Sequence, residues 1–474
     1  MARSYRRNLS CPTRNTSTVT VTFPTRTLGS MRLVPGTSFS SVTRLLVGGL
    51  VSALVTSVLL SSPAGATTPK APGDFTGHGF DTCVAPSQSV MDTWNLASPF
   101  SAIGIYVSGN SRYCGDAYQP NLTRAWVQRN ADNGWRFIPI HVGRQSPCFK
   151  NNPASRVQKQ KMSTDVATAR AEAVSEAQET IAALTKYGFG KGSVSYLDLE
   201  WYARSSACDN IVLEFVDAWT EHLHSQGYLS GLYSSGSAAI KLVDEARLSG
   251  RPGFTLPDHM WNAWVNQQAD TRGGPYLSDT GWVDHQRIHQ YHNGINVTYG
   301  GKTLNIDKNY LDVGRGSVAV KQSRPCGVTR SFTRYPTLRT GAKRREVAAL
   351  ECLLKKQGYL KKIDTRYGGG TARAVAKFRR SKGLGSSGTT NGATWTALLA
   401  KGSNPRVLKE GSVGEPVWRL QQSLTAAGLK PGLTGVYDAR TAASVKAYRK
   451  ARKLSGYTTT ESKVWSQLRR GKKA

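Results

Sequence analysis

The sequence predicts a TIM-type α/β barrel, with some irregularity in its strands, followed by two small all-α repeats. Two observations lead to this prediction. Residues 77–313 alternate short apolar runs with helical patterns, and the last third of the chain matches itself at a fixed offset. Alternating strands and helices are typical of a parallel sheet, and self-similarity at a fixed period is typical of repeated folding units.

Seven apolar runs in the first of these regions are candidate strands, and an eighth, shorter run is a possible extra piece. Helical patterns separate them, most clearly at 165–187 and 210–226. A closed or nearly closed barrel accommodates this order. A doubly wound sheet produces the same alternation and stays open as the alternative. The candidate strands cover 78–83, 102–109, 135–143, 193–201, 228–235, 260–267 and 287–294, with 303–307 as the extra piece.

An apolar stretch at residues 45–60 has the features of an export signal. Arginines precede it, and the small-residue triplet AGA follows it at 64–66. Such a pattern predicts a secretory signal peptide over residues 1–66, with Met31 as a possible true start. A stretch of about 16 residues is short for a membrane span, although a membrane anchor remains the alternative. We therefore expect a secreted protein, associated with the cell wall.

Six cysteines follow the signal segment, and Cys11 lies inside it. An even number in an exported chain predicts disulfides. About 15 connectivities are possible for six cysteines, and pairing sequence neighbours gives one of them. No C-x-x-C motif occurs, so zinc or thioredoxin chemistry has little support. The neighbour pairs are Cys83–Cys114, Cys148–Cys208 and Cys326–Cys352.

The positive charge of the chain is concentrated at its C-terminal end. The formal net charge is +33. Residues 67–330 hold 25 basic and 23 acidic residues, whereas residues 331–474 hold 31 and 7. A basic module beside a nearly neutral one is typical of a targeting device beside a working domain. The charge predicts an anionic partner, and the export signal argues against nucleic acid.

The basic region contains two repeats, over residues 331–402 and 403–474. Apolar positions in the first repeat have helical spacing. Each repeat is therefore expected to be a small helical unit with a glycine turn, at Gly358 in the first and at Gly428 in the second. Positions that match at the offset of 70 include Gly341 with Gly411, Val347 with Val417, Leu350 with Leu420, Tyr367 with Tyr437 and Trp395 with Trp465.

The segments VWRLQQSLTAAGL, GVYDARTAASVKAYRKARKL and VWSQL of the second repeat resemble the peptidoglycan-binding-domain-1 family. That resemblance implies a three-helix fold and binding to bacterial wall. Wall polymers carry carboxylates and often phosphates, which would attract the basic helices. A structural helical spacer is the alternative. The expected partners are therefore peptidoglycan and anionic wall polymers, with no nucleic acid and no stable membrane anchor.

Carboxylates stand at the ends of several candidate strands of the barrel region, residues 67–330. Asp198 and Glu200 are two residues apart in YLDLE, so both point to one face of a strand. Asp81 ends the first strand in GFD, and Asp307 lies in NID near the last. Four acids at one barrel rim would form an acidic pocket suited to general acid chemistry. Structural acids bonded to loop backbone are the alternative.

The motifs GFD, DLE, GLYSS, HQY and NID, in this order, resemble the family 25 glycoside hydrolases, the secreted wall muramidases. GFDTCVAPS and the cysteines are more similar to a sister group, the actinobacterial glycoside-hydrolase-like proteins. The resemblance implies that Glu200 is the acid and that Asp198 assists the substrate's acetamido group or the attacking water. It implies that Asp81 and Asp307 shape the pocket.

Several other residues near strand ends are candidates for contact with sugar. Aromatic side chains there could stack on sugar faces, although packing in the core or at the rim explains each of them equally well. The candidate substrate-binding residues are Tyr106, His141, Trp201, Tyr233, Trp264, Gln290 and Tyr291.

His285, His289 and His292 raise the question of a metal site. On a strand, the first two would share a face and the third would point the other way. We therefore expect no metal and no cofactor. The sequence predicts a muramidase-like hydrolase of wall glycan, and two alternatives stay open: a barrel that binds glycan without cutting it, and an inert envelope scaffold.

Overall fold

The structure is a computed structural model of the chain and describes residues 69–474. The predicted signal peptide and Cys11 lie outside the described residues. Within residues 69–474, no helix combines the length and the apolar character that crossing a membrane requires.

Eight strands form a closed barrel in the order β1 to β8. The barrel, and not the doubly wound sheet, is therefore the fold of this region. Each strand from β2 to β7 runs parallel to the one before it. The strands are Phe75–Asp81 (β1), Ala102–Ser108 (β2), Arg136–His141 (β3), Val194–Leu199 (β4), Leu229–Ser235 (β5), His259–Ala263 (β6), Gln286–Tyr299 (β7) and Lys302–Val313 (β8).

The last strand departs from the expected parallel arrangement, because β8 is antiparallel to both β7 and β1. β7 and β8 form a hairpin whose turn consists of Gly300 and Gly301, with φ values of +57° and +75°. Two adjacent residues with positive φ are typical of a tight hairpin turn, and glycine adopts this conformation readily. The extra piece at 303–307 is thus part of a long strand that closes the barrel.

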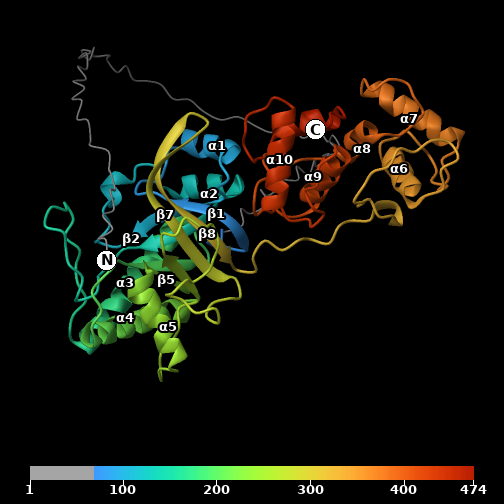
Figure 1. The fold of residues 1–474 in the computed structure, drawn as a ribbon. Coiled ribbons are helices and arrows are strands. Elements are labelled where there is room, and N and C mark those ends of the chain that lie inside the picture. The colour runs from blue at the N-terminus through green and yellow to red at the C-terminus, as the bar shows by residue number, and fades with distance from the viewer. Residues whose placement is uncertain (1–68) are drawn as a thin grey trace, which may run out of the picture. The chain divides into compact units, whose positions relative to one another are not determined.

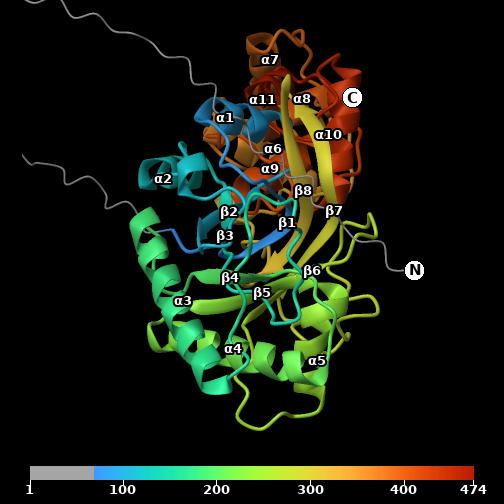
Figure 2. The ribbon, with the colours of Figure 1, turned by 90° about the vertical axis from the view of Figure 1, so that its left-hand side faces the viewer.

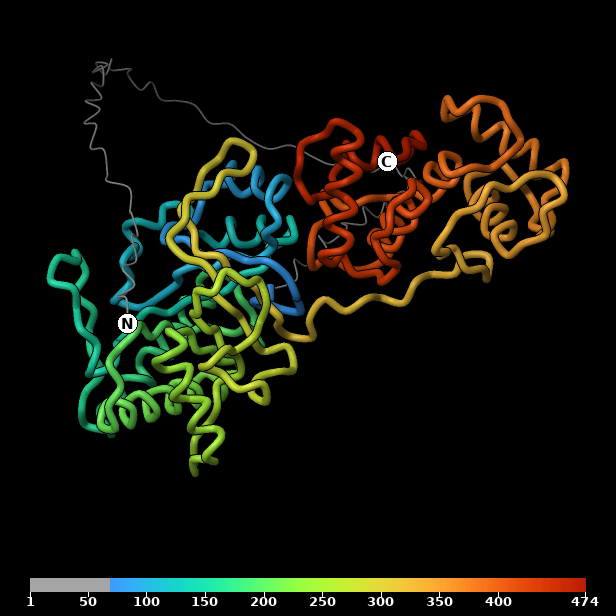
Figure 3. The backbone as a smooth tube through the Cα atoms, in the orientation of Figure 1, coloured from blue at the N-terminus to red at the C-terminus, as the bar shows by residue number. Residues whose placement is uncertain are grey.

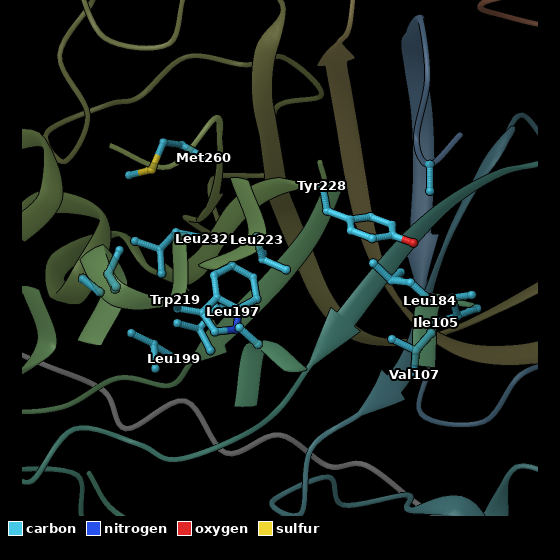
Figure 4. Close-up of a cluster of buried hydrophobic side chains, with 14 of the residues drawn as sticks. Ile105, Val107, Leu184, Leu197, Leu199, Trp219, Leu223, Tyr228, Leu232 and Met260 are labelled. Atoms are coloured by element: carbon cyan, nitrogen blue, oxygen red, sulfur yellow. The ribbon is translucent and has the colours of Figure 1, made fainter. Parts of the chain in front are cut away.

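Helices pack around the outside of the barrel, as Figure 2 shows for α3, α4 and α5. Strand residues of one parity, among them Leu197 and Leu199, pack against these helices in one large core (Figure 4). Residues of the other parity, such as Tyr196, fill the barrel interior. The helices of this region are Gln88–Ala97 (α1), Arg124–Asp132 (α2), Val166–Tyr187 (α3), Ser206–Ser225 (α4) and Lys241–Leu248 (α5), with a π-helix at Gly236–Ile240.

Two three-helix units follow the barrel (Figure 1), and Figure 3 shows their backbones as two similar coils, orange and red. Corresponding helices start and end 70 residues apart. Gly358 and Gly428, with φ values of +77° and +104°, follow the first helix of each unit as expected. The helices are Arg345–Lys356 (α6), Gly369–Ser381 (α7) and Gly392–Leu399 (α8), then Glu415–Ala426 (α9), Ala439–Ala451 (α10) and Ser462–Arg469 (α11).

The six described cysteines form three disulfides, which are the neighbour pairs Cys83–Cys114, Cys148–Cys208 and Cys326–Cys352. The first two lie in the barrel region, next to loops that leave its strands. The third joins the segment after the barrel to α6, so residues around 326 are covalently tied to the first repeat.

Candidate functional site

Three of the predicted acids lie at the carboxyl ends of two barrel strands, and the fourth lies beside Asp81 in the antiparallel strand β8. Asp81 is the last residue of β1, and Asp198 and Glu200 lie at and just beyond the end of β4. Asp307 lies in β8 directly opposite Asp81 in the antiparallel register. The carboxyl ends of the strands are where barrel enzymes place their active sites, so this rim is the candidate functional site.

Asp81 is held by a network of neutral donors. Asn309 Nδ2 donates to Asp81 Oδ1 over 2.8 Å, and the Tyr106 hydroxyl donates to Oδ2 over 3.2 Å. Trp261 Nε1 donates in turn to Asn309 Oδ1 over 2.9 Å, which fixes the orientation of the amide. The neighbouring Gly104 leaves room for this carboxylate, because a Cβ there would lie 2.5 Å from the Cβ of Asp81. Asp81 therefore has one defined position.

Gln290 connects the two acids that the hairpin brings together. Its Nε2 lies 3.3 Å from Asp81 Oδ1 and 3.4 Å from Asp307 Oδ2. The Tyr233 hydroxyl donates to Gln290 Oε1 over 3.0 Å, and the backbone N–H of Gly294 donates to Asp307 Oδ1 over 2.6 Å. Two predicted substrate-binding residues, Gln290 and Tyr233, thus position the acids from within the barrel.

Asp198 and Glu200 are fixed by Gln145, which lies in the loop after β3. Its Nε2 donates to the backbone oxygen of Asp198 over 2.9 Å, and its Oε1 accepts from the N–H of Glu200 over 2.7 Å. Asp198 has the parity of Tyr196 and is 1% exposed, whereas Glu200 is half-buried. Glu200 is therefore the more accessible of the two acids.

The loop between β3 and α3 also brings a cation to this rim. Lys159 Nζ lies 3.4 Å from Glu200 Oε1. Asn151 fixes the backbone of Lys159 through two hydrogen bonds, of 2.7 Å and 2.9 Å. The Cys148–Cys208 disulfide ties the same loop to α4. A nearby cation favours the ionised form of a carboxylate, so Lys159 favours the anionic form of Glu200 in this arrangement.

The remaining predicted contact residues differ in exposure. The His141 side chain is fully buried, and its Nδ1 and Nε2 face Ser108 Oγ at 2.8 Å and Glu176 Oε2 at 3.2 Å. Trp201, beside Glu200, is 52% exposed, and Trp264 is half-buried. Tyr291 is buried, and burial raises the pKa of its hydroxyl. Trp201 and Trp264 are the predicted aromatic residues with most surface available for a sugar.

His285, which directly precedes β7, and His289 within β7 do not converge on one point. His285 Nδ1 pairs with Asp312 Oδ1 at 2.8 Å. The ring nitrogens of His289 face the backbone oxygens of Asp270 and Trp264, at 2.8 Å and 2.7 Å. Within the described part of the chain, no group of three or more His, Cys, Asp or Glu residues could hold a metal ion.

Sequence reasoning missed three residues of this site: Asn309, Gln145 and Lys159. Asn309 could have been found, because it lies two residues after Asp307 and so shares its strand face. Gln145 and Lys159 lie in a loop without periodicity, so no sequence signal indicated that they approach β4.

Matches to two family models agree with this geometry. Residues 92–311 match the Rv2525c-like, glycoside hydrolase-like domain, and residues 343–398 match a putative peptidoglycan binding domain. The chain thus carries an Rv2525c-like, glycoside hydrolase-like barrel together with a peptidoglycan binding domain, and its function concerns cell-wall glycan. The second match covers the first repeat. No curated protein matches the chain.

Solved structures that match part of the chain include an uncharacterised B. stearothermophilus protein, with 15% identity and a TM-score of 0.33 over 50% of this chain and 95% of that chain. The Tat-secreted protein Rv2525c of Mycobacterium tuberculosis, in complex with L-tartrate, has 13% identity and a TM-score of 0.33, with the same coverages. The modular autolysin LytC of Streptococcus pneumoniae has 13% identity and a TM-score of 0.31, over 50% of this chain and 46% of that chain.

Proposed function

We propose that the protein is a secreted, muramidase-like hydrolase that cleaves the glycan of peptidoglycan, and that its basic repeats hold it on the wall. The observation that carries this proposal is the group of four acids at one barrel rim. Glycosidases need a proton donor for the departing oxygen and a second group on the other side of the sugar. The glycoside hydrolase-like and peptidoglycan binding family matches support the substrate class.

Within this proposal, Glu200 is the general acid and Asp198 orients the substrate's acetamido group or a water. Glu200 is half-buried and reachable, and Gln145 fixes the backbone on both sides of the pair. Asp81 and Asp307 shape the floor of the site through Gln290. Proton donation by Glu200 is favoured when Lys159 moves away, because the nearby cation favours the ionised carboxylate.

The wall location rests on the repeats and the cysteines. Residues 331–474 carry most of the excess positive charge, which favours carboxylates and phosphates of wall polymers. Three disulfides are typical of an oxidising, extracellular environment. Export through a signal peptide over residues 1–66, and domain limits near residues 330 and 402, are parts of the same proposal.

One observation favours a second candidate function, in which the barrel binds glycan without hydrolysing it. The ion pair between Lys159 and Glu200, with 3.4 Å between Nζ and Oε1, favours the anionic form of the proposed acid. A barrel that kept this pair when ligand is bound would bind sugar through its aromatic residues and leave the glycosidic bond intact.

The deciding experiment measures turbidity and new reducing ends on purified peptidoglycan. Wild-type protein should release reducing ends, and Glu200→Gln should lower the rate by about 10²–10⁴-fold, the usual contribution of a general acid. Asp198→Asn should also be severe. Glu221→Gln, which alters a half-exposed acid on α4 paired with Arg170, is the matched control and should leave the rate unchanged.

Wild-type protein that binds wall but releases no reducing ends would establish the glycan-binding alternative. Cleavage that survives Glu200→Gln would show that the acid is wrongly assigned, and Asp81 and Asp307 would be the next acids to change.

A further inference from the structure

A cleft beside α11 in the second repeat, which we name the α11 cleft, has the features of a ligand site. Its volume is about 910 Å³, and its lining includes Tyr457, Lys463, Trp465 and Arg469, together with Leu96 of α1 and one acid, Glu461, which pairs with Arg449. Lys463 is exposed, and the Trp465 side chain is 1% exposed. A cleft of this size holds a small ligand or a short segment of a larger one.

Two hydrogen-bond donors that line the α11 cleft have no acceptor in the described part of the chain. They are the indole Nε1 of Trp465 and the Nε of Arg469, and both atoms are buried. The two residues are four apart on α11, so their side chains share one face of the helix. A buried donor without a partner costs free energy, and a ligand that brings an acceptor recovers that cost.

The equivalent tryptophan of the first repeat is satisfied by its own chain. Trp395 Nε1 donates to the backbone oxygen of Pro336 over 2.9 Å. The ring of Tyr335 packs against Trp395, with 5.2 Å between ring centroids, and belongs to the same core. The residues 70 positions later are Pro405 and Arg406. The first repeat therefore fills the space that the second repeat leaves open.

Part of the polar lining of the α11 cleft is also absent from the first repeat, although Arg449 has an equivalent there in Arg379. Three side chains are replaced by small or apolar ones at the equivalent positions: Tyr457 by Ser387, Lys463 by Ala393 and Arg469 by Leu399. The α11 cleft therefore combines positive charge with the unpaired donors of Trp465 and Arg469, whereas the described part of the first repeat has such a donor only at Arg379 Nε. Both features favour a ligand that brings a hydrogen-bond acceptor, and the positive charge favours an anionic one.

We propose that the α11 cleft binds a carboxylate at the end of a wall peptide, which makes the second repeat the ligand-binding one. This inference rests on the proposed wall-binding function and adds the chemical group that is recognised. A guanidinium and an indole N–H both donate to carboxylate oxygens. The apolar side chains Pro405, Leu454 and Trp465, which also line the cleft, favour a peptide over a bare phosphate polymer.

The test uses the full secreted chain with ¹⁵N-labelled tryptophan. A synthetic peptide that ends in D-alanyl-D-alanine should shift the indole N–H signal of Trp465 and leave that of Trp395 unchanged. Its C-terminal amide should bind at least tenfold more weakly, because the charge-assisted acceptor is lost. Trp465→Phe and Arg469→Leu, read by calorimetry, should each weaken binding by about ten- to a hundredfold, whereas the matched control Trp395→Phe should not.

Three outcomes would overturn the inference: equal binding of the acid and the amide, a Trp465 shift with glycerol phosphate oligomers only, or no shift with any probe. Pelleting of the wild-type chain with purified wall separates this inference from the proposed function. Pelleting without a Trp465 shift refutes the cleft and leaves wall binding intact, whereas failure to pellet refutes wall binding itself.

Discussion

The two C-terminal repeats have the same helices at a constant offset, yet they differ in how each one completes its core. In the first repeat, Tyr335 and Pro336 lie ahead of α6 and complete the core, and the Pro336 oxygen accepts a hydrogen bond from the indole N–H of Trp395. The second repeat leaves the N–H of Trp465 without an acceptor among the described residues. The two repeats therefore share a backbone but not a surface, because the segments that precede α6 and α9 differ, and only the one before α6 fills the space beside the tryptophan.

A second difference lies inside the first helix of each repeat. Glu351 accepts hydrogen bonds from the N–H groups of Asp364 and Thr365 and from the Thr371 hydroxyl. Gln421, 70 residues later, accepts from two backbone N–H groups and donates to the Thr441 hydroxyl over 3.0 Å. The same loop is thus held by a carboxyl in one repeat and by an amide in the other.

The largest expected difference between the repeats comes from the disulfide that only the first one has. Changing Cys326 and Cys352 together to serine should destabilise the first repeat by about 3 kcal/mol, the value for a closed loop of this length. The sequence separation of 26 residues sets that length. Melting followed by ¹⁹F NMR of 5-fluorotryptophan at Trp395 and Trp465 reports each repeat separately.

The Trp465 signal should melt as in the wild-type protein, which serves as the internal control. An equal loss of stability at both tryptophans would show that the repeats unfold as one unit. The unmodified protein, denatured without reductant, should contain no free thiol from the six cysteines after the signal segment.

A smaller difference should follow from replacing each tryptophan with phenylalanine. Both changes remove similar volume from a core, but only Trp395→Phe leaves an acceptor, the Pro336 oxygen, without its donor. Trp395→Phe should therefore cost about 1 kcal/mol more than Trp465→Phe. Hydrogen exchange in α6–α8 and in α9–α11 measures the loss of unfolding free energy in each variant. Equal losses would contradict the difference in indole hydrogen bonding.

Much of the barrel could be predicted because its signals are local and periodic. Apolar strands with alternating parity and a two-residue spacing placed Asp198 and Glu200 at the end of β4. Helical spacing with a repeat predicted two small helical units, and the family resemblance implied three helices in each. The antiparallel β8 was less visible, since its direction depends on the Gly300–Gly301 turn and not on strand pattern.

The predicted site lacked the contacts that arise between distant segments. Lys159 reaches Glu200 across 41 residues, and Gln145 reaches the backbone of β4 across more than 50. Neither lies in a periodic element, and loop side chains have no pattern that indicates their partners. The roles of the four acids and the sugar-contacting aromatic residues stay predictions until activity is measured.

The smallest expected effect concerns Glu351, and it has a defined pH dependence. Burial raises the pKa of this carboxyl above its ordinary value. The folded first repeat therefore holds the proton more tightly than the unfolded chain, so its stability is greatest below the ordinary pKa. That stability falls as the pH rises from the ordinary pKa to the raised one, and it is constant above the raised pKa.

Glu351→Gln should remove this dependence, because the amide has no proton to lose and can donate to Thr371 as Gln421 does to Thr441. At pH 7 we expect the first repeat of the variant to be more stable than that of the wild type, with a free energy of unfolding higher by no more than about 1 kcal/mol. Near pH 4 we expect the two to be equally stable. The reciprocal Gln421→Glu should transfer the same pH dependence to the second repeat. Fluorotryptophan melting at several pH values measures both, and a first repeat whose pH profile is unchanged by Glu351→Gln would show that another group controls it.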